Sequence, residues 1–360
     1  MKILFSGGGT LGPVTPLLAI KDVVLEKDAE SSFVWIGTSG GPERQLIEEH
    51  RLPFYPITAG KFRRYFSFLN IFDVVRVVVG FFQSIRILLK ENPDICITAG
   101  GFVSVPVHSA AWLLGIPTWV HQQDVEVGLA NKLMTPLAKM ITTSLEGITK
   151  EFPAKKTVWL GNPVRKEIFE GNRAHARKMF NLTSRLPVVL VLGGGTGSLK
   201  VNQLIAEATP HLGSHAEIIH LSGKERPQES VVKTAELFPN YRVYQFLGRE
   251  MKDAYAVADI IVCRGGFGTL TEAAALGKPC IIIPKPGHQV ENVRFLERAG
   301  AAVLVNELTA DGLFLAKKIR EILGNPDYAK SLATSMHHTL KTAESKDILE
   351  IYNRVLGIAP

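Results

Sequence analysis

The stretch from Asp259 to Asn292 constrains the fold of this chain more than any other. An apolar run from Asp259 to Cys263 is long enough for a buried strand. A glycine-rich turn follows, then an alanine-rich helix that closes at Gly277, then a second apolar run from Cys280 to Ile283. This order predicts a strand, a turn, a helix and a parallel strand. The helix N-terminus would then face a crevice beyond the strand ends, where an anion such as a diphosphate binds.

The chain carries this design more than once. The segment Asp94 to Phe102 contains an aspartate, an apolar run and Gly-Gly-Phe, each 165 positions before its counterpart between Asp259 and Phe267. In a second echo, the runs Lys2–Phe5 and Val188–Leu192 each enter a Gly-Gly-Gly-Thr turn. Because the two pairs follow the same order, we predict two similar α/β halves that face each other, each built on a doubly wound parallel sheet.

The length of 360 residues suits two domains of ordinary size. Asn162-Pro163 is a turn signal, and a new strand begins at Val188. We therefore predict a first domain over residues 1–162 and a second over residues 163–344. The sequence leaves open whether the final helix, residues 345–360, packs on the first domain.

Several classes of protein are disfavoured by composition. A net charge of +7 is too small for this length to argue for nucleic acid. The three cysteines lie in or at the ends of apolar runs without metal-ligand spacing, so we expect buried free thiols in a reducing compartment. The start of the chain lacks the pattern of a signal peptide. The sequence contains no run of about 18 uncharged apolar residues, so we expect no transmembrane helix.

The first glycine turn, Gly7 to Gly12, is weakly specific by itself. It is not a P-loop, because no Gly-Lys-Ser/Thr follows at the required spacing. It fits a dinucleotide-binding pattern, but the acidic residue that this pattern needs is ambiguous between Asp28 and Glu30. A nicotinamide-dependent enzyme therefore stays an open alternative, although no other motif supports it.

Taken together, the motifs resemble the MurG family of glycosyltransferases over nearly the whole chain. In order they are Gly8 to Thr10, Gly100 to Pro106, His121 to Asp124, Gly128 to Lys132, Gly161 to Arg165, Gly193 to Ser198, Cys263 to Gly266 with Glu272, and Gln289 with Asn292. The resemblance implies the GT-B fold, in which two Rossmann-like domains face a cleft. It also implies a peripheral location at the cytoplasmic face of the cell membrane.

The activity implied by the resemblance is inverting transfer of N-acetylglucosamine. The donor would be UDP-N-acetylglucosamine, and the acceptor the 4-hydroxyl of an N-acetylmuramoyl-pentapeptide on a polyprenyl diphosphate, in peptidoglycan synthesis. No cofactor and no obligatory metal are expected. The chemistry agrees, because fixed N–H dipoles and a cation stabilise the charge that develops on the leaving UDP. The acceptor hydroxyl needs a base within hydrogen-bond reach.

The resemblance also implies roles for individual residues. Glu272 would bind the ribose hydroxyls, the backbone near Leu247 would face uracil, and Gln289 with His288 would bind the sugar. Arg165 would add a cation at the diphosphate. The N–H groups facing the diphosphate would belong to Phe267, Gly268, Thr269, Leu270 and Thr271. The other positions expected at the substrates are Thr10, Leu11, Gly12, Asp124, Asn131, Gly195 and Thr196.

This sequence departs from the family at the catalytic positions. Pro13 stands where the family usually has a histidine, and Asp124 stands where it usually has an asparagine. Gly195 replaces a usual serine, and the loop between Pro284 and Gln289 is shorter than usual. Without the histidine, the candidates for removing the acceptor proton are Asp124 and His121.

Several of these residues also have an interpretation in which they only stabilise the fold and bind no ligand. Glu272 with Thr269 has the form of a capping box. Asp124 fits a turn cap, His121 a hydrogen-bonded structural histidine, and Arg165 a salt bridge between the domains. Two other functions stay open for the whole chain. One is a different GT-B enzyme, such as a UDP-sugar epimerase or a glycolipid glycosyltransferase, and the other is a non-catalytic UDP-sugar-binding subunit.

The segment from Lys61 to Lys90 combines positive charge with apolar surface. It contains six cations and one acid, a balance of +5, among many aromatic and aliphatic residues. One interpretation is a core helix with a basic solvent face. The other is a docking patch for an anionic membrane surface, which would bring the protein to a lipid-linked acceptor.

Overall fold

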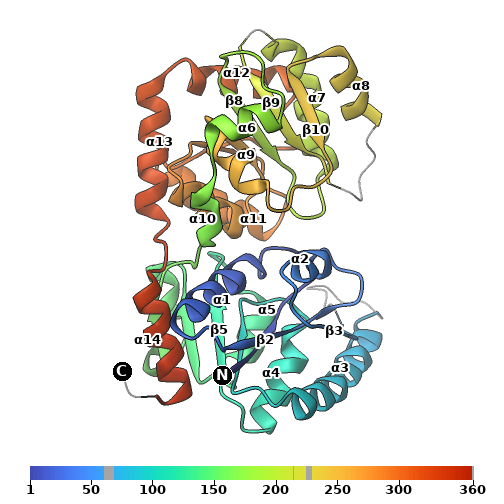
Figure 1. Cartoon of the computed structure of the whole chain (residues 1–360), viewed down its shortest axis with the longest axis vertical. Helices are drawn as coiled ribbons and strands as arrows, with labels where there is room; N and C mark the ends of the chain where they lie inside the picture. The colour runs from blue at the N-terminus through green and yellow to red at the C-terminus, as the bar shows by residue number, and fades with distance from the viewer. Residues whose placement is uncertain (61–68, 214, 224–228, 359–360) are drawn as a thin grey trace. The chain divides into compact units, whose positions relative to one another are not determined.

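The computed structural model describes the chain except for residues 61–68, 214, 224–228 and 359–360 (Figure 1). It divides into two compact units: unit 1 comprises Met1–Arg165 with Thr342–Pro360, and unit 2 comprises Lys166–Lys341. The boundary predicted after residue 162 lies three residues before this division, and the one predicted after residue 344 lies three residues after it.

Unit 1 is built on a seven-stranded parallel sheet in the order β3-β2-β1-β4-β5-β6-β7. The order reverses between β1 and β4, so the turns after these two strands lie at a topological switch point, where such sheets bind ligands. The strands are β1 (Lys2–Ser6), β2 (Ser32–Thr38), β3 (Phe54–Ile57), β4 (Ile95–Thr98), β5 (Thr118–Gln122), β6 (Met140–Thr143) and β7 (Thr157–Trp159).

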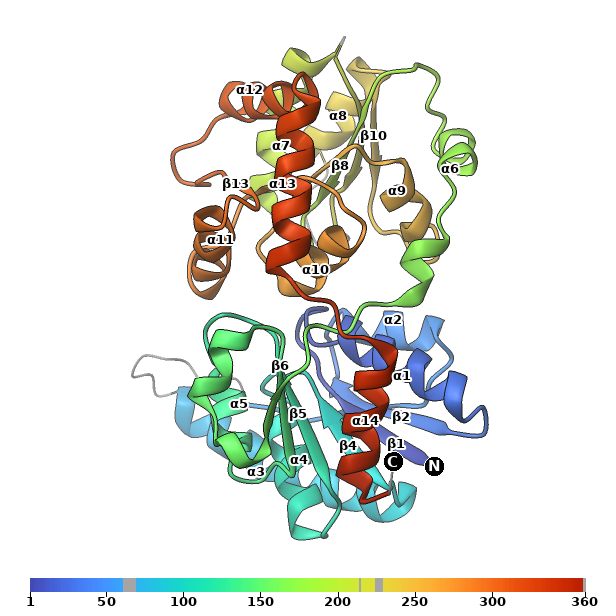
Figure 2. The ribbon, with the colours of Figure 1, turned by 90° about the vertical axis from the view of Figure 1, so that its left-hand side faces the viewer.

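Helices cover both faces of this sheet, because alternate strand residues point to opposite sides. Ile3 and Phe5 pack in one core with α1 and α14, whereas Leu4 packs in another with α3 and α4. Figure 2 shows α14 lying beside α1, so the final helix belongs to unit 1. The helices are α1 (Thr15–Lys27), α2 (Glu43–Glu49), α3 (Leu69–Glu91), α4 (Ser104–Leu113), α5 (Leu129–Met134) and α14 (Ser345–Leu356), with 3₁₀ turns η1 (Glu146–Glu151) and η2 (Ala154–Lys156).

Unit 2 repeats the design with six parallel strands in the order β10-β9-β8-β11-β12-β13. Its switch point lies between β8 (Val188–Leu192) and β11 (Ile260–Cys263). The other strands are β9 (Glu217–Leu221), β10 (Tyr241–Tyr244), β12 (Cys280–Ile282) and β13 (Val303–Leu304). The helices are η3 (Lys166–Glu170), α6 (Arg173–Met179), α7 (Leu199–Leu212), α8 (Glu229–Leu237), α9 (Met251–Val257), α10 (Phe267–Ala275), α11 (His288–Arg298), α12 (Gly312–Leu323) and α13 (Pro326–Thr339).

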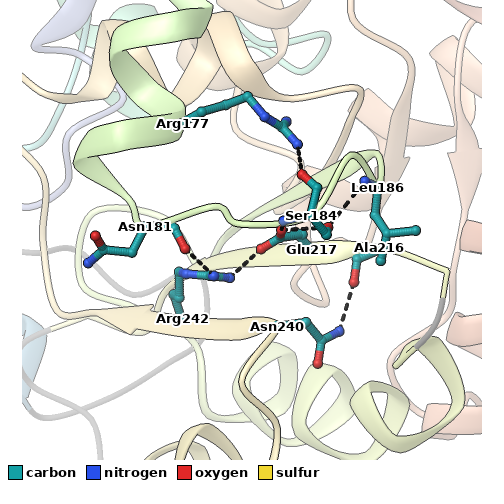
Figure 3. A network of polar contacts seen from close by, with 8 residues as sticks. All are labelled: Arg177, Asn181, Ser184, Leu186, Ala216, Glu217, Asn240 and Arg242. Atoms are coloured by element: carbon teal, nitrogen blue, oxygen red, sulfur yellow. Dashed lines mark hydrogen bonds and ion pairs between the residues drawn. The ribbon is translucent and has the colours of Figure 1, made fainter.

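The two doubly wound parallel sheets confirm the predicted fold class. The three cysteines are buried and free, as expected. A buried ion pair fixes the amino ends of β9 and β10 (Figure 3). One oxygen of Glu217 accepts hydrogen bonds from the N–H and hydroxyl of Ser184, at 2.8 and 2.6 Å, and the other oxygen pairs with Arg242. The segment before β8 is thereby tied to the sheet at the edge opposite the turns that follow the strands.

Candidate functional site

The N-terminus of α10 lies at the switch point of unit 2. The helix begins at Phe267, directly after the turn that ends β11, and its N-cap is Gly266, which provides no side-chain cap. A Cβ on Gly266 would meet no atom within 4 Å. The capping-box interpretation is therefore wrong, because Thr269 lies inside the helix. The first N–H groups and the positive end of the dipole face open space.

The structure narrows which N–H groups of α10 can reach a diphosphate. Among the residues that the structure describes, none accepts a hydrogen bond from the N–H groups of Phe267, Gly268 or Thr269. Leu270 donates its N–H to the carbonyl of Gly266, and its side chain lies in the core. The Thr271 hydroxyl donates to the carbonyl of Phe267. Three N–H donors without an acceptor are thus available at the start of α10, and the expected contacts of Leu270 and Thr271 with the diphosphate stay predictions.

Glu272 lies one turn further along α10, and its side chain is only 4% exposed. Its Oε2 accepts a hydrogen bond from the hydroxyl of Tyr255 on α9, at 2.9 Å. Tyr255 is itself buried. This contact orients the carboxylate from a neighbouring helix, and the sequence pattern gave no signal for it.

The turn after β8 lies next to the turn after β11 in the sheet order. Gly194 and Gly195 are exposed and Thr196 is half-buried, whereas Ser198 caps α7 by accepting from the N–H of Val201. Gly194 has a φ of +85°, which favours glycine, and a Cβ there would meet nothing within 4 Å. This turn is therefore an open loop at the switch point, where Gly195 and Thr196 were expected.

The start of α11 packs against the turn after β11. A Cβ on Gly265 would lie 3.2 Å from the Cβ of Gln289, and Asn292 donates from Nδ2 to the Gly265 carbonyl at 3.1 Å. Oε1 of Gln289 accepts from the N–H of Lys285, so the short loop before α11 is held by the residue expected at the sugar. His288 is the first residue of α11, and its side chain lies outside the described part of the chain.

Arg264 was not singled out from the sequence as a site residue, yet it joins the ends of four strands. It follows β11, and its guanidinium donates to the hydroxyl of Ser198 after β8 and to the carbonyl of Ile283 after β12. It also pairs with Glu307 after β13. Arg264 therefore fixes the turns that carry the predicted donor-binding residues. Leu247, which was expected at uracil, is half-buried and follows β10 in the same unit.

Unit 1 brings two of its predicted segments together. Thr10 is exposed, and Leu11 and Gly12 are half-buried, although Leu11 also packs on the core. Nε2 of Gln123 donates to the carbonyl of Gly12 at 3.1 Å. The half-buried Asp124 follows in the same loop, after β5. The loops after β1 and β5 are therefore connected, and Asp124 lies in the loop that is tied to Gly12.

His121 has the environment of a structural histidine, which disfavours the catalytic role expected for it. Its side chain has no exposed surface, and burial lowers its pKa to about 4. Nε2 lies 2.9 Å from Oδ1 of Asn162, an acceptor, so Nε2 carries the proton. Nδ1 then accepts from the hydroxyl of Thr142, at 2.9 Å. An enclosed imidazole that uses both nitrogens is poorly placed to take a proton from an acceptor sugar.

The two remaining predicted residues of unit 1 are buried. Asn131 donates from Nδ2 to Oε1 of Gln122 at 2.6 Å, and among the described residues its buried Oδ1 has no hydrogen-bond partner. Arg165 is 8% exposed and ends unit 1. It follows Asn162, which accepts from the N–H of Ala343 at 3.0 Å. The segment that carries Arg165 is thus anchored by His121 through Asn162.

Comparisons with known proteins identify the family. The glycosyltransferase family 28 N-terminal domain matches residues 3–143, and the C-terminal domain of the same family matches residues 188–351. The UDP-N-acetylglucosamine–N-acetylmuramyl-(pentapeptide) pyrophosphoryl-undecaprenol N-acetylglucosamine transferase of Treponema denticola is 36% identical over 337 residues, which cover 87% of this chain and 86% of the relative. A Bacillus cereus protein with the same name, numbered 2, is 34% identical over 92% of this chain and 94% of its own.

Solved structures share the fold. MurG of Acinetobacter baumannii superposes with a TM-score of 0.69 and 23% identity, over 98% of this chain and 99% of its own. The UDP complex of MnaA from S. aureus gives a TM-score of 0.72 with 11% identity, over 99% and 97%. At these identities the two structures support the fold alone. The sequence matches confirm the resemblance that the motifs carry, and the chain belongs to the MurG family of glycosyltransferases, within glycosyltransferase family 28.

Proposed function

We propose that this chain transfers N-acetylglucosamine from its UDP donor to the 4-hydroxyl of an N-acetylmuramoyl-pentapeptide on a polyprenyl diphosphate, with inversion at the anomeric carbon. The observation that carries the proposal is the match, at 34 and 36% identity over most of the chain, to proteins named for this transfer. The site in unit 2 supports it, because its groups suit a nucleoside diphosphate.

In this proposal unit 2 binds the donor. The N–H groups of Phe267, Gly268 and Thr269 hold the diphosphate and stabilise the charge that develops on it as the glycosyl–phosphate bond breaks. Glu272, oriented by Tyr255, accepts from the ribose hydroxyls. Gln289 binds the sugar, and Leu247 lies at uracil. The role of Arg165, the last residue of the first segment of unit 1, as a cation at the diphosphate stays a prediction from the family resemblance.

Unit 1 provides the acceptor side of the reaction. The chain has proline at position 13, and His121 is enclosed, so Asp124 is the remaining candidate of the two for taking the proton from the acceptor hydroxyl. The loop Thr10–Gly12, whose Gly12 carbonyl accepts from Gln123, is assigned to substrate binding in this proposal. No cofactor enters this scheme. Among the residues that the structure describes, no group of three or more His, Cys, Asp or Glu lies together so as to hold a metal ion.

The experiment that tests the function measures UDP release from UDP-N-acetylglucosamine with and without a soluble analogue of the muramyl lipid. We expect release only with the acceptor, together with an elongated glycan product by mass spectrometry. Isomerised UDP-sugar without acceptor would instead assign an epimerase, and binding without turnover would assign a UDP-sugar-binding subunit.

We further propose that α3 docks unit 1 on an anionic membrane surface, peripherally and at the cytoplasmic face. The described part of α3 turns an apolar face to solvent: Val75 is 57% exposed and Phe82 is 64% exposed. Trp112, on the neighbouring α4, is 58% exposed. A core helix with a purely basic solvent face would not show these side chains. No helix in the described ranges is long and apolar enough to span a bilayer. Lys61, Arg63 and Arg64 lie outside the described residues.

Removing this apolar face should weaken vesicle binding. The double variant Val75→Ser/Phe82→Ser loses two side chains whose burial contributes about 1.5–3 kcal/mol each, so we expect at least about tenfold weaker co-sedimentation with anionic vesicles. The charge reversal Arg63→Glu/Arg64→Glu should weaken binding most at low salt. Leu237→Ser, at a 74% exposed position of α8 in unit 2, is the matched control. Binding that ignores lipid charge, salt and both double variants would contradict docking through this surface.

A further inference from the structure

Glu43 places a buried carboxylate inside the first glycine turn. The residue begins the short helix α2, yet its side chain has no exposed surface. Oε2 accepts a hydrogen bond from the N–H of Gly9 at 3.1 Å, and Oε1 accepts from the N–H of Thr38 at 2.8 Å and from the Thr38 hydroxyl. Burying a carboxylate is costly unless donors compensate it. Here three donors do so, one from the loop after β1 and two from Thr38 at the end of β2.

The buried carboxylate leaves room only for glycine at two neighbouring positions. A Cβ on Gly8 would lie 2.1 Å from Oε1 of Glu43, and a Cβ on Gly41 would lie 1.9 Å from Oε2. Neither position has room for another side chain while the carboxylate stays in place. The glycines that resemble a phosphate-binding turn in the sequence therefore surround an anion that belongs to the protein.

Three further N–H groups around this turn also have acceptors within the protein. Gly7, Val14 and Thr15 donate their N–H groups to backbone carbonyls. Pro13 and Pro16 have no N–H to offer. Among the described residues, none accepts a hydrogen bond from the N–H groups of Gly8, Thr10, Leu11 or Gly12. The first turn therefore differs from the entry to α10 in its buried carboxylate and not in a lack of N–H donors.

The corresponding turn of unit 2 is different. Among the residues described there, none accepts a hydrogen bond from the N–H groups of Gly194, Gly195 or Thr196. The space beside Gly194 is open, whereas the space beside Gly8 is filled by Glu43. Two turns with the same Gly-Gly-Gly-Thr sequence thus differ in whether an internal anion occupies them.

We infer that Glu43 is a built-in anion that takes the place of a phosphate in the first glycine turn and fixes the conformation of that turn, leaving the donor diphosphate to unit 2. Glu43 is a positioning residue, because it acts through Gly9 on the neighbouring Thr10 and Gly12. Its negative charge also disfavours a second anion in the same turn. The inference rests on the proposed function and adds a reason why the donor diphosphate binds only one of two similar turns.

The test compares Glu43→Gln with Glu48→Gln, an exposed position of the same helix that pairs with Arg44. Glutamine keeps the shape but turns an NH₂ donor toward the N–H of Gly9 or Thr38. We expect kcat to fall at least about tenfold, because a small misplacement of a positioning loop has large effects on rate. The Kd for UDP, measured by calorimetry, should stay within about twofold, since the diphosphate binds in unit 2. Glu48→Gln should match wild type in both measurements.

A weaker affinity for UDP in Glu43→Gln would show that the first turn binds the diphosphate, and wild-type turnover in this variant would show that Glu43 positions nothing. Either result overturns the inference. If the glutamine variant does not fold, Thr38→Val can be used, because it removes one donor to the same carboxylate. This variant should also lower kcat and leave the Kd for UDP unchanged, with a smaller decrease in kcat. Failure of the proposed function is a separate outcome, because wild type itself would then release no UDP with acceptor.

Discussion

Asp124→Asn is expected to lower turnover by about 10²–10⁴ while the affinity for UDP stays within about twofold. Asparagine keeps the shape of the side chain but cannot take a proton. The backbone is held independently of the carboxylate, because Nε2 of Gln122 donates to the Asp124 carbonyl at 2.8 Å. The loop should therefore stay in place, and the loss should fall on kcat with the acceptor present.

The measurement is acceptor-dependent UDP release under saturating donor, with UDP affinity determined separately by calorimetry. Asp22→Asn, at a surface position of α1 that pairs with Lys21, is the control for removing one aspartate from unit 1. Near-normal turnover of Asp124→Asn would remove this residue as the base. Because the other candidate, His121, is enclosed and neutral, water would then be the next candidate to test.

Local sequence signals were sufficient to predict the sheets. The strands beside the switch points, β1, β4, β8 and β11, are short apolar runs that lead into glycine turns, and a helix follows each of them, so this strand–turn–helix order could be predicted without long-range information. The echo at a spacing of 165 residues then predicted two similar halves. Individual roles came instead from the family resemblance, since glycine turns of the same sequence can bind a phosphate or exclude one.

The features that the sequence did not reveal depend on contacts between distant residues. Thr269 and Glu272 have capping-box spacing, but the helix begins two residues before Thr269, and Glu272 is held by Tyr255 from α9. The role of His121 depends on Asn162, 41 residues away. In the sequence, Glu43 looks like an ordinary acidic residue in the first turn of a helix. Only the structure shows that its carboxylate fills the space beside Gly8. Local patterns cannot report which side chain fills such a space.

Glu272→Ala is expected to weaken UDP binding by about 10²-fold or more, because each charge-assisted hydrogen bond to a ribose hydroxyl contributes about 1.5–3 kcal/mol. The structure removes the competing explanation, since α10 begins at Phe267 without a side-chain cap and the loss of Glu272 leaves its N-terminus unchanged. The measurement is calorimetric titration with UDP, and thermal unfolding of each variant serves as a check on the fold.

A ligand lacking the 2′-hydroxyl of the ribose tests the contact itself. Wild type should bind 2′-deoxy-UDP more weakly than UDP, whereas Glu272→Ala should bind the two ligands alike, because the partner of the missing hydroxyl is already gone. Tyr255→Phe keeps the carboxylate and removes only the hydroxyl that orients it. Its effect should therefore be about fivefold, in line with one ordinary hydrogen bond. If Glu272→Ala unfolds early but binds UDP with wild-type affinity, the carboxylate supports the packing of α9 on α10, and the ribose must be bound elsewhere in unit 2.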